Sequence, residues 1–273
     1  MKLSADERPA EAGEDLEAAY REILARSPKV FASPEMLAQA ANPMEAWFYG
    51  HHGRRTGKWA HYLEVYDHYL SRFRDRPVRL LEIGVSHGGS LQVWKRYLGP
   101  QAQVHGLDIN PQVAAIDDED LKVHIGDQSD PGVLDRILAE TGGFEVVIDD
   151  GGHVGADQIA SFEHLFPRLA DGGVYICEDL HAAYWRFHGG GLGRSGTFIE
   201  YIKGLLDALH SRYFEAGEGR EVAPWLRHVH AVSVYDSIAV IEKRTPRDPF
   251  RFIVGRQKLI APSTPVTKPV RPV

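Results

Sequence analysis

The chain has 273 residues, of which 43% are hydrophobic and 25% are charged, and its formal net charge at pH 7 is -7. This composition is typical of a globular protein, and no apolar run approaches the roughly 20 residues that a membrane-spanning helix needs. Domains whose main partner is nucleic acid usually carry a basic face, so the acidic balance argues against that class. We therefore expect a protein that binds neither nucleic acid nor a membrane.

The first part of the chain, 1–50, is expected to form an N-terminal helical extension. Residues 1 to about 12 are expected to be disordered, whereas 15–27 place apolar side chains at helical spacing. A Ser-Pro pair then opens a second short helix over 34–41. The start of the chain lacks the apolar segment of a signal peptide, and the single Cys177 suits a reducing compartment, so we expect a cytoplasmic protein.

Residues 48–73 combine glycine and basic residues with a helical run that begins near residue 57. Its aromatic residues fall near one stripe, which favours a helix packed on the core. A second interpretation is that Lys58, His61 or Tyr62 reaches a ligand carried by the strand that follows. The aromatic residues of the stripe are Trp59, Tyr62, Tyr66 and Tyr69.

From residue 78 onwards, apolar runs of strand length alternate with helical runs. This alternation predicts right-handed βαβ units and a doubly wound α/β fold with a parallel sheet, within a main domain over 51–245. The strand-like runs are 78–85, 102–109, 144–149 and 174–179, and the helical runs are 90–98, 133–140 and 157–170.

The last part of the main domain begins with a glycine-rich segment, 186–197, which we expect to be a mobile loop able to act as a lid. A helix is expected at about 197–214. Two strand-like runs, 228–235 and 237–243, then read as a tight hairpin at the sheet edge. The remainder, 246–273, is rich in proline towards its end and is expected to be extended or disordered.

Acidic residues end two neighbouring strand-like runs. Asp149 and Asp150 end one and are followed by His153, and Glu178 and Asp179 end the next. In open α/β sheets ligands bind at the carboxyl ends of the strands, so these side chains are candidates for chemistry. Oxygen donors suit a hard cation such as Mg²⁺, with calcium and manganese as alternatives, and zinc is disfavoured. The other interpretation is that the acids cap the helices that follow.

Glycines follow the first strand and open a helix, a pattern that lets a ligand approach the backbone. Their spacing, with Glu82 inside the strand end, is not the dinucleotide fingerprint, which disfavours an NAD-dependent oxidoreductase. Asp108 and Asp127 end the next two strands. Acids at three successive strand ends indicate an adenosine ligand that carries positive charge.

These motifs resemble those of class I S-adenosylmethionine-dependent methyltransferases, and more narrowly the Mg-dependent sugar O-methyltransferases of antibiotic biosynthesis, with the related rhamnosyl methyltransferase and cephalosporin hydroxylase families. The resemblance covers about 45–245. It implies a Rossmann-like, seven-stranded, mostly parallel sheet with a C-terminal antiparallel hairpin. The motifs that carry it are T-G-K-W-x-H-Y, E-x-G-x-x-x-G-G, L-D-I, G-D-Q, I-D-D-G-G-H, E-D-L-H-x-x-Y-W and Y-D-S-I-x-V-I-E-K.

The resemblance also implies a set of site residues. In this reading S-adenosyl-L-methionine has its methionine end near Glu82 and Gly84, its ribose on Asp108 and its adenine near Asp127. The full expected cofactor set is Lys58, Tyr62, Glu82, Gly84, Ser90, Asp108, Asp127, Gln128 and Asp149. The expected Mg²⁺ ligands are Asp150, Glu178 and Asp179, the expected catalytic residues are His153 and Asp150, and the expected substrate residues are His181, Tyr184 and Trp185.

The expected function is transfer of a methyl group to a hydroxyl of a deoxysugar, free as a glycoside or nucleotide-activated. The hydroxyl must lose a proton, and His153 is the expected base, with His181 as the competitor. A catechol or another vicinal diol is the alternative acceptor, and a non-catalytic cofactor-binding partner is a less favoured class. Relatives form symmetric oligomers, so a homo-oligomer is expected.

Overall fold

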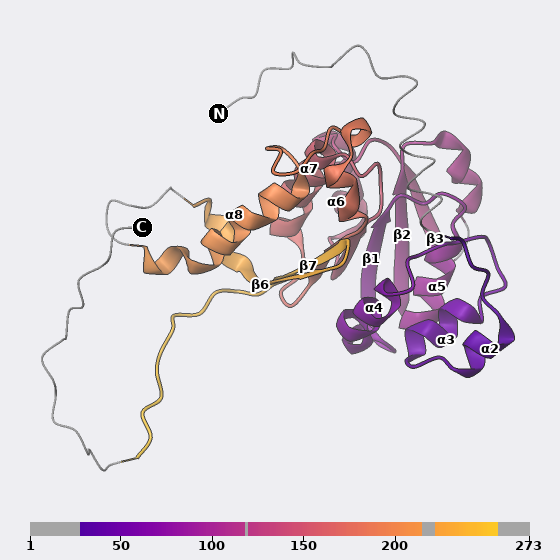
Figure 1. Cartoon of the computed structure of the whole chain (residues 1–273), viewed down its shortest axis with the longest axis horizontal. Coiled ribbons are helices and arrows are strands. Elements are labelled where there is room, and N and C mark those ends of the chain that lie inside the picture. Colours follow the sequence, from indigo (N-terminus) through magenta and orange to yellow (C-terminus); the bar gives the residue numbers. More distant parts are fainter. Residues whose placement is uncertain (1–27, 118–119, 215–221, 256–273) are drawn as a thin grey trace, which may run out of the picture.

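A seven-stranded sheet organises the part of the chain that the computed structural model describes, residues 28–117, 120–214 and 222–255 (Figure 1). The strand order is β3-β2-β1-β4-β5-β7-β6, with the first five strands parallel and β7 and β6 antiparallel to their neighbours. This confirms the predicted sheet and hairpin. The strands are β1 (Val78–Ile83), β2 (Ala102–Asp108), β3 (Leu121–Ile125), β4 (Val146–Asp149), β5 (Val174–Cys177), β6 (Val229–Tyr235) and β7 (Ile238–Lys243).

Helices cover both faces of the sheet because alternate residues of each buried strand point to opposite sides. Val146 and Ile148 of β4 belong to one apolar core, and Val147 belongs to the other. The first core includes residues of α3 (Pro43–Tyr49), α4 (Tyr62–Leu70) and α5 (Gly89–Leu98), and the second includes residues of α6 (Pro131–Thr141), α7 (Gly155–Leu165) and α8 (Phe198–His210). The short helix α2 (Pro34–Ala38) has no buried residue and contacts α3. Short 3₁₀ turns join the elements: Ser71–Phe73, Pro111–Ile116, Phe166–Arg168, Leu180–Tyr184, Arg186–His188, Ser211–Tyr213 and Pro224–His228.

The connection order reverses between β1 and β4, where α/β sheets form their ligand crevice. The register places Ile83 beside Asp149, and Asp149 beside Cys177. Two backbone hydrogen bonds extend this register beyond the strands: Asp150 N donates to Ile83 O, and Glu178 N donates to Asp149 O, both over 2.9 Å. The acids that end β4 and β5 are therefore brought to one edge of the sheet.

The first two helices of the described chain, α2 and α3, begin at proline, and each is capped. Ser33 and Asn42 accept hydrogen bonds from the first-turn amides of α2 and α3. The helix predicted over 34–41 ends at Ala38, because the second cap opens a new helix shortly afterwards. The expected helix at 15–27 and the disorder expected at 1–12 lie outside the described residues.

The helix predicted to begin near residue 57 begins at Tyr62, so the segment before it is irregular. Tyr62, Tyr66 and Tyr69 are buried in the core as predicted, but Trp59 is 38% exposed and lies outside the helix. The difference arises because Lys58 and Trp59 turn towards the acidic ends of β4 and β5 instead of continuing the helical stripe.

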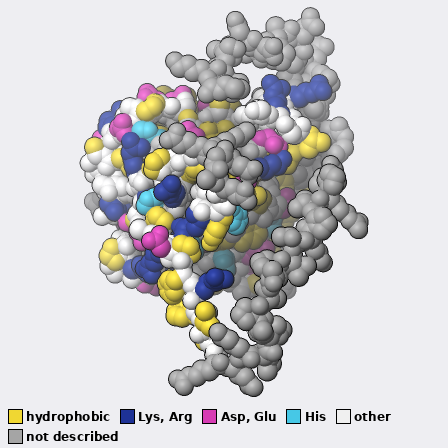
Figure 2. Space-filling model, turned by 90° about the vertical axis from the view of Figure 1, so that its left-hand side faces the viewer, with side chains coloured by type: hydrophobic (Ala, Val, Ile, Leu, Met, Phe, Trp, Pro, Cys, Tyr) yellow, Lys and Arg dark blue, Asp and Glu magenta, His cyan; other side chains and the backbone are white. Residues whose placement is uncertain are grey.

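The C-terminal part of the described chain leaves the sheet after β7. Residues 244–255 contain neither helix nor strand, and the rest of the proline-rich tail lies outside the described residues. Among the residues that are described, no helix has the length and apolar character to cross a bilayer. On the face of the described residues that Figure 2 shows, basic side chains are scattered among acidic and apolar ones and do not form one continuous patch.

Candidate active site

The turn after β1 brings the backbones of two strand ends into contact. Gly84 has a φ of +90°, and a Cβ placed there would lie 2.0 Å from the carbonyl oxygen of Asp150. A Cβ at Gly89, at the start of α5, would lie 2.2 Å from Arg54 O. Gly84 therefore lets the chain after β4 approach the turn after β1, and Gly89 lets the segment before α4 approach the start of α5.

Substituting Gly84 with alanine is expected to lower the free energy of unfolding by about 3 kcal/mol or more, because it combines a left-handed backbone with a backbone clash. Urea unfolding measures this loss. Gly152→Ala is the matched control, since a Cβ at Gly152 meets nothing within 4 Å and is expected to cost less than about 1 kcal/mol. Equal stability of the two variants would contradict this account of the turn.

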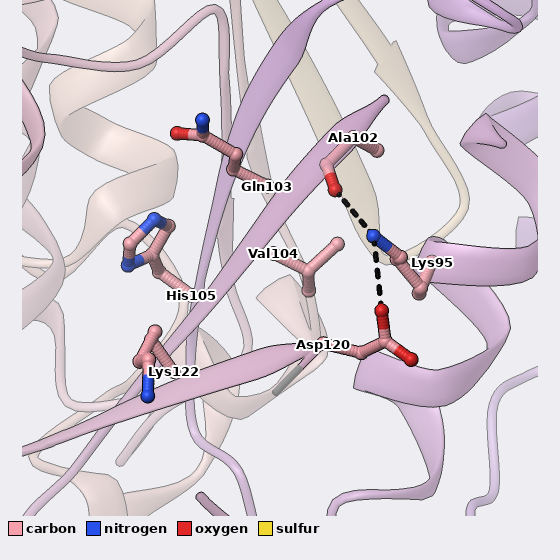
Figure 3. A pocket seen from close by; sticks show the side chains of 7 residues that line it. All are labelled: Lys95, Ala102, Gln103, Val104, His105, Asp120 and Lys122. Carbon is pink, nitrogen blue, oxygen red and sulfur yellow. Dashed lines mark hydrogen bonds and ion pairs between the residues drawn. The ribbon is translucent and has the colours of Figure 1, made fainter. Parts of the chain in front are cut away.

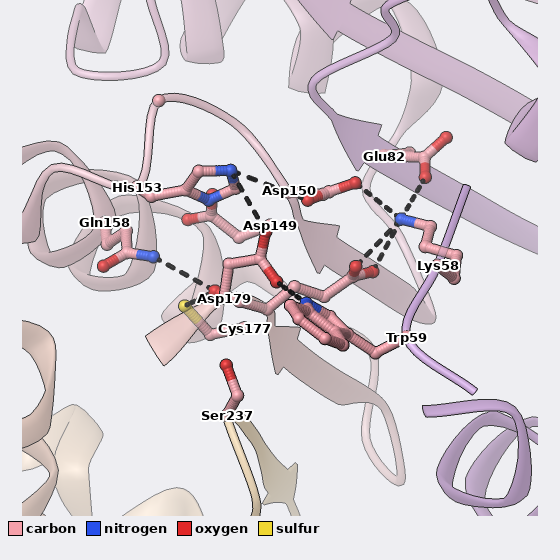
Figure 4. Close-up of polar contacts among 12 residues, drawn as sticks. Lys58, Trp59, Glu82, Asp149, Asp150, His153, Gln158, Cys177, Asp179 and Ser237 are labelled. Carbon is pink, nitrogen blue, oxygen red and sulfur yellow. Dashed lines mark hydrogen bonds and ion pairs between the residues drawn. The ribbon is translucent and has the colours of Figure 1, made fainter. Parts of the chain in front are cut away.

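A buried lysine lies among three carboxylates at the centre of the candidate site (Figure 4). Lys58 Nζ is 2.6 Å from Asp150 Oδ2, 2.9 Å from both oxygens of Glu178 and 3.3 Å from Glu82 Oε1. Its side chain is only 3% exposed. Burial alone would lower the pKa of the Lys58 ammonium, but the three carboxylates outweigh this effect and hold its pKa well above the ordinary value.

Glu82 and Glu178 are buried on either side of this ammonium. Burial raises the pKa of both carboxyl groups, and the Lys58 charge opposes the rise. Ser90 Oγ donates to Glu82 Oε2 over 2.6 Å. The cofactor role expected of Lys58 and Ser90 stays a prediction; in the structure both contact Glu82 in the acidic cluster.

A second group of side chains lies on the open side of the cluster. His153 Nε2 is 3.9 Å from Asp150 Oδ1 and 3.5 Å from Asp179 Oδ2, and these three side chains are 21–25% exposed. One potential ligand atom from each lies within 4.8 Å of the others. His153 and Asp179 have φ values of 54° and 53°, the left-handed region that non-glycine residues rarely adopt and that is enriched at functional sites.

Two aromatic side chains hold Asp179 in this orientation. Trp59 Nε1 and Tyr62 Oη donate to Asp179 Oδ1 over 3.1 and 3.0 Å, and Oδ2 is left facing His153. Tyr62 Oη also lies 2.9 Å from Ser237 O, so its single O–H is shared between these two acceptors. Tyr62, which the sequence assigned to the cofactor, therefore contacts the acidic cluster, and Trp59, which sequence reasoning placed in the core, takes part in the site. Its position directly after Lys58 was the available signal.

Asp149 lies beneath the site, and the sequence allowed either the cofactor side or a place behind the contacting residues for it. It is 0% exposed, and Tyr175 Oη, Ser161 Oγ and Gln128 Nε2 donate to its carboxylate. Gln128 Oε1 accepts in turn from Gly152 N. Asp149 and Gln128 thus hold the backbone that follows β4, and in the described conformation the Asp149 carboxylate does not reach the surface.

Two further expected cofactor residues lie at the ends of β2 and β3. Asp108 Oδ2 accepts from Val85 N and Ser86 N over 2.9 and 3.1 Å, so it holds the turn after β1. Asp127 is exposed, and its Oδ1 accepts from Ser129. Both lie along the crevice edge where the resemblance places the ribose and the adenine.

The 3₁₀ turns after β5 build an aromatic wall beside the acidic cluster. His181 Nδ1 is hydrogen-bonded to Ser237 Oγ, and its ring packs 5.7 Å from Trp59 and 4.6 Å from Trp185. The ring of His188 lies 6.1 Å from that of His153. Sequence reasoning missed His188, and no motif marks it.

Tyr184, the other expected substrate residue, is exposed beside this wall. The 3₁₀ turn Arg186–His188 opens the glycine-rich segment, and the lid motion expected for that segment stays a prediction.

A cavity of about 220 Å³ lies away from this cluster, in the amino-terminal halves of β2 and β3 (Figure 3). Lys95 Nζ donates there to Ala102 O over 2.8 Å and lies 3.4 Å from Asp120 Oδ1. Lys95 and Asp120 pair with each other, Lys122 pairs with Asp117 outside the lining, and the carboxyl ends of the strands are elsewhere. We therefore place the candidate active site at the acidic cluster.

Residues 81–180 match a family model described as a methyltransferase domain. This match spans β1 to the end of β5 and so contains the glycine turn and both acidic strand ends. The fold and this match together define a Rossmann-like methyltransferase domain, and the matched part of the chain belongs to this family.

Within this family, the chain is similar to sugar O-methyltransferases. It is 37% identical over 206 residues to the 8-demethyl-8-(2-methoxy-alpha-L-rhamnosyl)-tetracenomycin-C 3'-O-methyltransferase of Streptomyces olivaceus, covering 71% of this chain and 52% of the relative. It is 37% identical over 188 residues to the mycinamicin VI 2''-O-methyltransferase of Micromonospora griseorubida, covering 65% and 47%. The chain therefore spans about half the length of these curated relatives.

A solved structure has a similar fold. The MycE methyltransferase from the mycinamycin biosynthetic pathway, in complex with Mg and SAH, superposes with a TM-score of 0.66 and 30% identity. The superposition covers 88% of this chain and 66% of that one.

Proposed function

We propose that this protein is a Mg²⁺-dependent O-methyltransferase that moves the methyl group of S-adenosylmethionine to a hydroxyl of a deoxysugar in a natural product or its nucleotide-activated precursor. The observation that carries the proposal is the open group of Asp150, His153 and Asp179, which lies beside the glycine turn of the methyltransferase domain. It offers oxygen ligands and a base next to the crevice where the cofactor is expected.

The cofactor belongs at the carboxyl ends of β1 to β3 in this proposal. Asp108 holds the turn after β1, Gly84 allows the close backbone approach, and Asp127 is exposed further along the edge. The acidic cluster holds more carboxylates than the single Lys58 ammonium can balance, which favours a further cationic ligand, and the sulfonium of S-adenosylmethionine is such a cation.

The donor set fits Mg²⁺. Asp150 and Asp179 present carboxylate oxygens on the open side, and hard cations prefer such ligands. Glu178 is the third proposed ligand; both its oxygens contact Lys58, and each carboxylate oxygen has a further lone pair. When bound, the cation would supply positive charge that favours ionisation of a nearby hydroxyl.

His153 is the proposed base because its Nε2 faces the open side between Asp150 and Asp179. The acceptor hydroxyl gives its proton to Nε2, its oxygen forms a bond to the methyl carbon, and the bond from that carbon to sulfur breaks. His181 suits the role less well, because its Nδ1 is bonded to Ser237 and its ring packs between Trp59 and Trp185. It is proposed, with Trp185 and Tyr184, to line the acceptor site.

The acceptor class is tested with matched acceptors. The names of two relatives specify O-methylation of rhamnosyl tetracenomycin-C compounds, which supports a deoxysugar here. Labelled S-adenosylmethionine is offered with rhamnosylated compounds, nucleotide-linked deoxysugars and catechol. Transfer to a sugar is expected, and transfer to catechol alone would favour the alternative of an aromatic diol methyltransferase.

The proposal includes a cytoplasmic homo-oligomer. Cys177 is a buried free thiol, which suits a reducing compartment. Phe250, Phe252 and Ile253 are exposed after β7, and a second copy would cover such apolar surface. Light scattering of the purified protein measures the oligomeric state, and a monomer at micromolar concentration would contradict this part.

A further inference from the structure

Lys58 divides the acidic cluster into two halves. The inner acidic site consists of Glu82, Glu178 and Asp150 Oδ2, and Lys58 Nζ contacts all three. The outer acidic site consists of Asp150 Oδ1 and Asp179, with His153 beside them. Each half has ligand atoms within 4.8 Å of one another, so each has the spacing of a cation site.

We propose that Lys58 is a positioning residue whose ammonium occupies the inner acidic site and so confines the divalent cation to the outer one, where Glu178 reaches the cation only through the lone pairs that Lys58 leaves free. The inference rests on the proposed function, because it assumes that a divalent cation binds this cluster. It assigns to Lys58 a role that is distinct from contact with the cofactor.

The hydrogen bonds of Lys58 support this role. An ammonium has three N–H donors, and three carboxylates surround this one within 3.3 Å. The donors are thereby used within the cluster, and the side chain is buried. By binding Asp150 Oδ2 over 2.6 Å, Lys58 also leaves Oδ1 of the same carboxylate turned towards His153.

The charges of the acidic cluster also support the role proposed for Lys58. Glu82, Asp150, Glu178 and Asp179 carry four negative charges when ionised. The Lys58 ammonium, one divalent cation and one sulfonium together supply four positive charges, so the substrate complex is balanced. A neutral residue at position 58 would leave the inner carboxylates buried without a counter-charge, which strongly favours uptake of another cation.

Lys58 reaches the cluster from a part of the chain that is remote from the strand ends. It is 92 residues from Asp150 and 120 from Glu178 in sequence, and it lies in the irregular segment before α4. Because the neighbouring Arg54 carbonyl packs over Gly89 at the start of α5, this segment is held against the crevice. The packing of this segment against α5 therefore fixes the position of the Lys58 ammonium.

Binding of Mn²⁺, counted by electron paramagnetic resonance and isothermal titration calorimetry, tests the inference. Wild type and Lys58→Arg, which keeps the charge, are expected to bind one Mn²⁺ per chain. Lys58→Met is expected to bind a second Mn²⁺, or to bind the first at least about tenfold more tightly, because the competing charge is gone. Lys122→Met, which removes an exposed lysine paired with Asp117, is the matched control and is expected to behave as wild type.

Thermal melting gives a second readout. Mn²⁺ is expected to raise the melting temperature of Lys58→Met more than that of wild type, since the cation replaces a lost counter-charge. If Lys58→Met does not fold, Lys58→Gln is used as the neutral variant in both measurements. One Mn²⁺ per chain with unchanged affinity in the neutral variants would overturn the role of Lys58 alone. Absence of Mn²⁺ binding in wild type would overturn the metal-dependent function, and the inference with it.

Discussion

Replacement of Asp150 by asparagine is expected to lower kcat for methyl transfer by about 1000-fold or more, because it removes a charged ligand that both halves of the acidic cluster share. The substitution keeps the shape of the side chain. Its amide would also weaken the contact with Lys58. Steady-state kinetics with saturating S-adenosylmethionine measure the effect, and Mn²⁺ affinity should fall in the same variant.

Asp135→Asn is the matched control for this prediction. Asp135 is an exposed carboxylate whose Oδ1 lies 2.8 Å from His164 Nε2, far from the strand ends that form the cluster. Its loss is expected to leave kcat within about threefold of wild type. A kcat of Asp150→Asn equal to that of this control would remove Asp150 from the mechanism.

Replacement of His153 by alanine is expected to lower kcat by about 100-fold to 10,000-fold, the usual contribution of a general base. Affinity for S-adenosylhomocysteine should change little, because the imidazole faces the acids on the open side. Kinetics and calorimetry of the same preparation separate the two effects.

His181→Ala is the comparison that identifies the base. His181 lies next to the same carboxylates, with Nδ1 4.0 Å from Asp179 Oδ1, but it is bonded to Ser237 and packed in the aromatic wall. Its loss is expected to raise KM for the acceptor and to lower kcat less than about tenfold. The reverse order of the two kcat values would make His181 the base.

The sheet and the acidic strand ends were predictable from local pattern. Apolar runs that alternate with helical ones specify parallel strands, and the carboxyl ends of neighbouring parallel strands share an edge. Asp150, Glu178 and Asp179 meet for this reason. The sequence left two interpretations of these acids open, helix caps and a cation site. The N-cap of α7 is Val154, and no side chain caps this helix, so the acids that end β4 are not its caps.

The burial of Asp149 was also within reach of the sequence. Successive side chains of a strand point to opposite faces, so Asp149 and Asp150 were unlikely partners in one crevice. Asp149 follows Val147 into the second core, where Tyr175 and Ser161 satisfy its carboxylate. Burial raises the pKa of this carboxyl group, and the hydrogen bonds oppose the rise.

The position of Lys58 could not be read from local pattern. Helical periodicity continued the stripe from Tyr62 back to Trp59, yet the chain leaves the helix there because the carboxylates attract Lys58 and Asp179 accepts from Trp59. Contacts between segments about 100 residues apart depend on the packing of α4 and α5 on the sheet. They have no signature in residue spacing.

The most direct test of the function is the metal dependence of methyl transfer to a sugar. Purified protein, S-adenosylmethionine and a rhamnosylated acceptor are incubated with Mg²⁺ or with a chelator, and the methylated product is measured by mass spectrometry. The account predicts a sugar methyl ether with Mg²⁺, a loss of at least about 100-fold with chelator, and recovery when Mg²⁺ is restored. Equal product formation with and without chelator would contradict it.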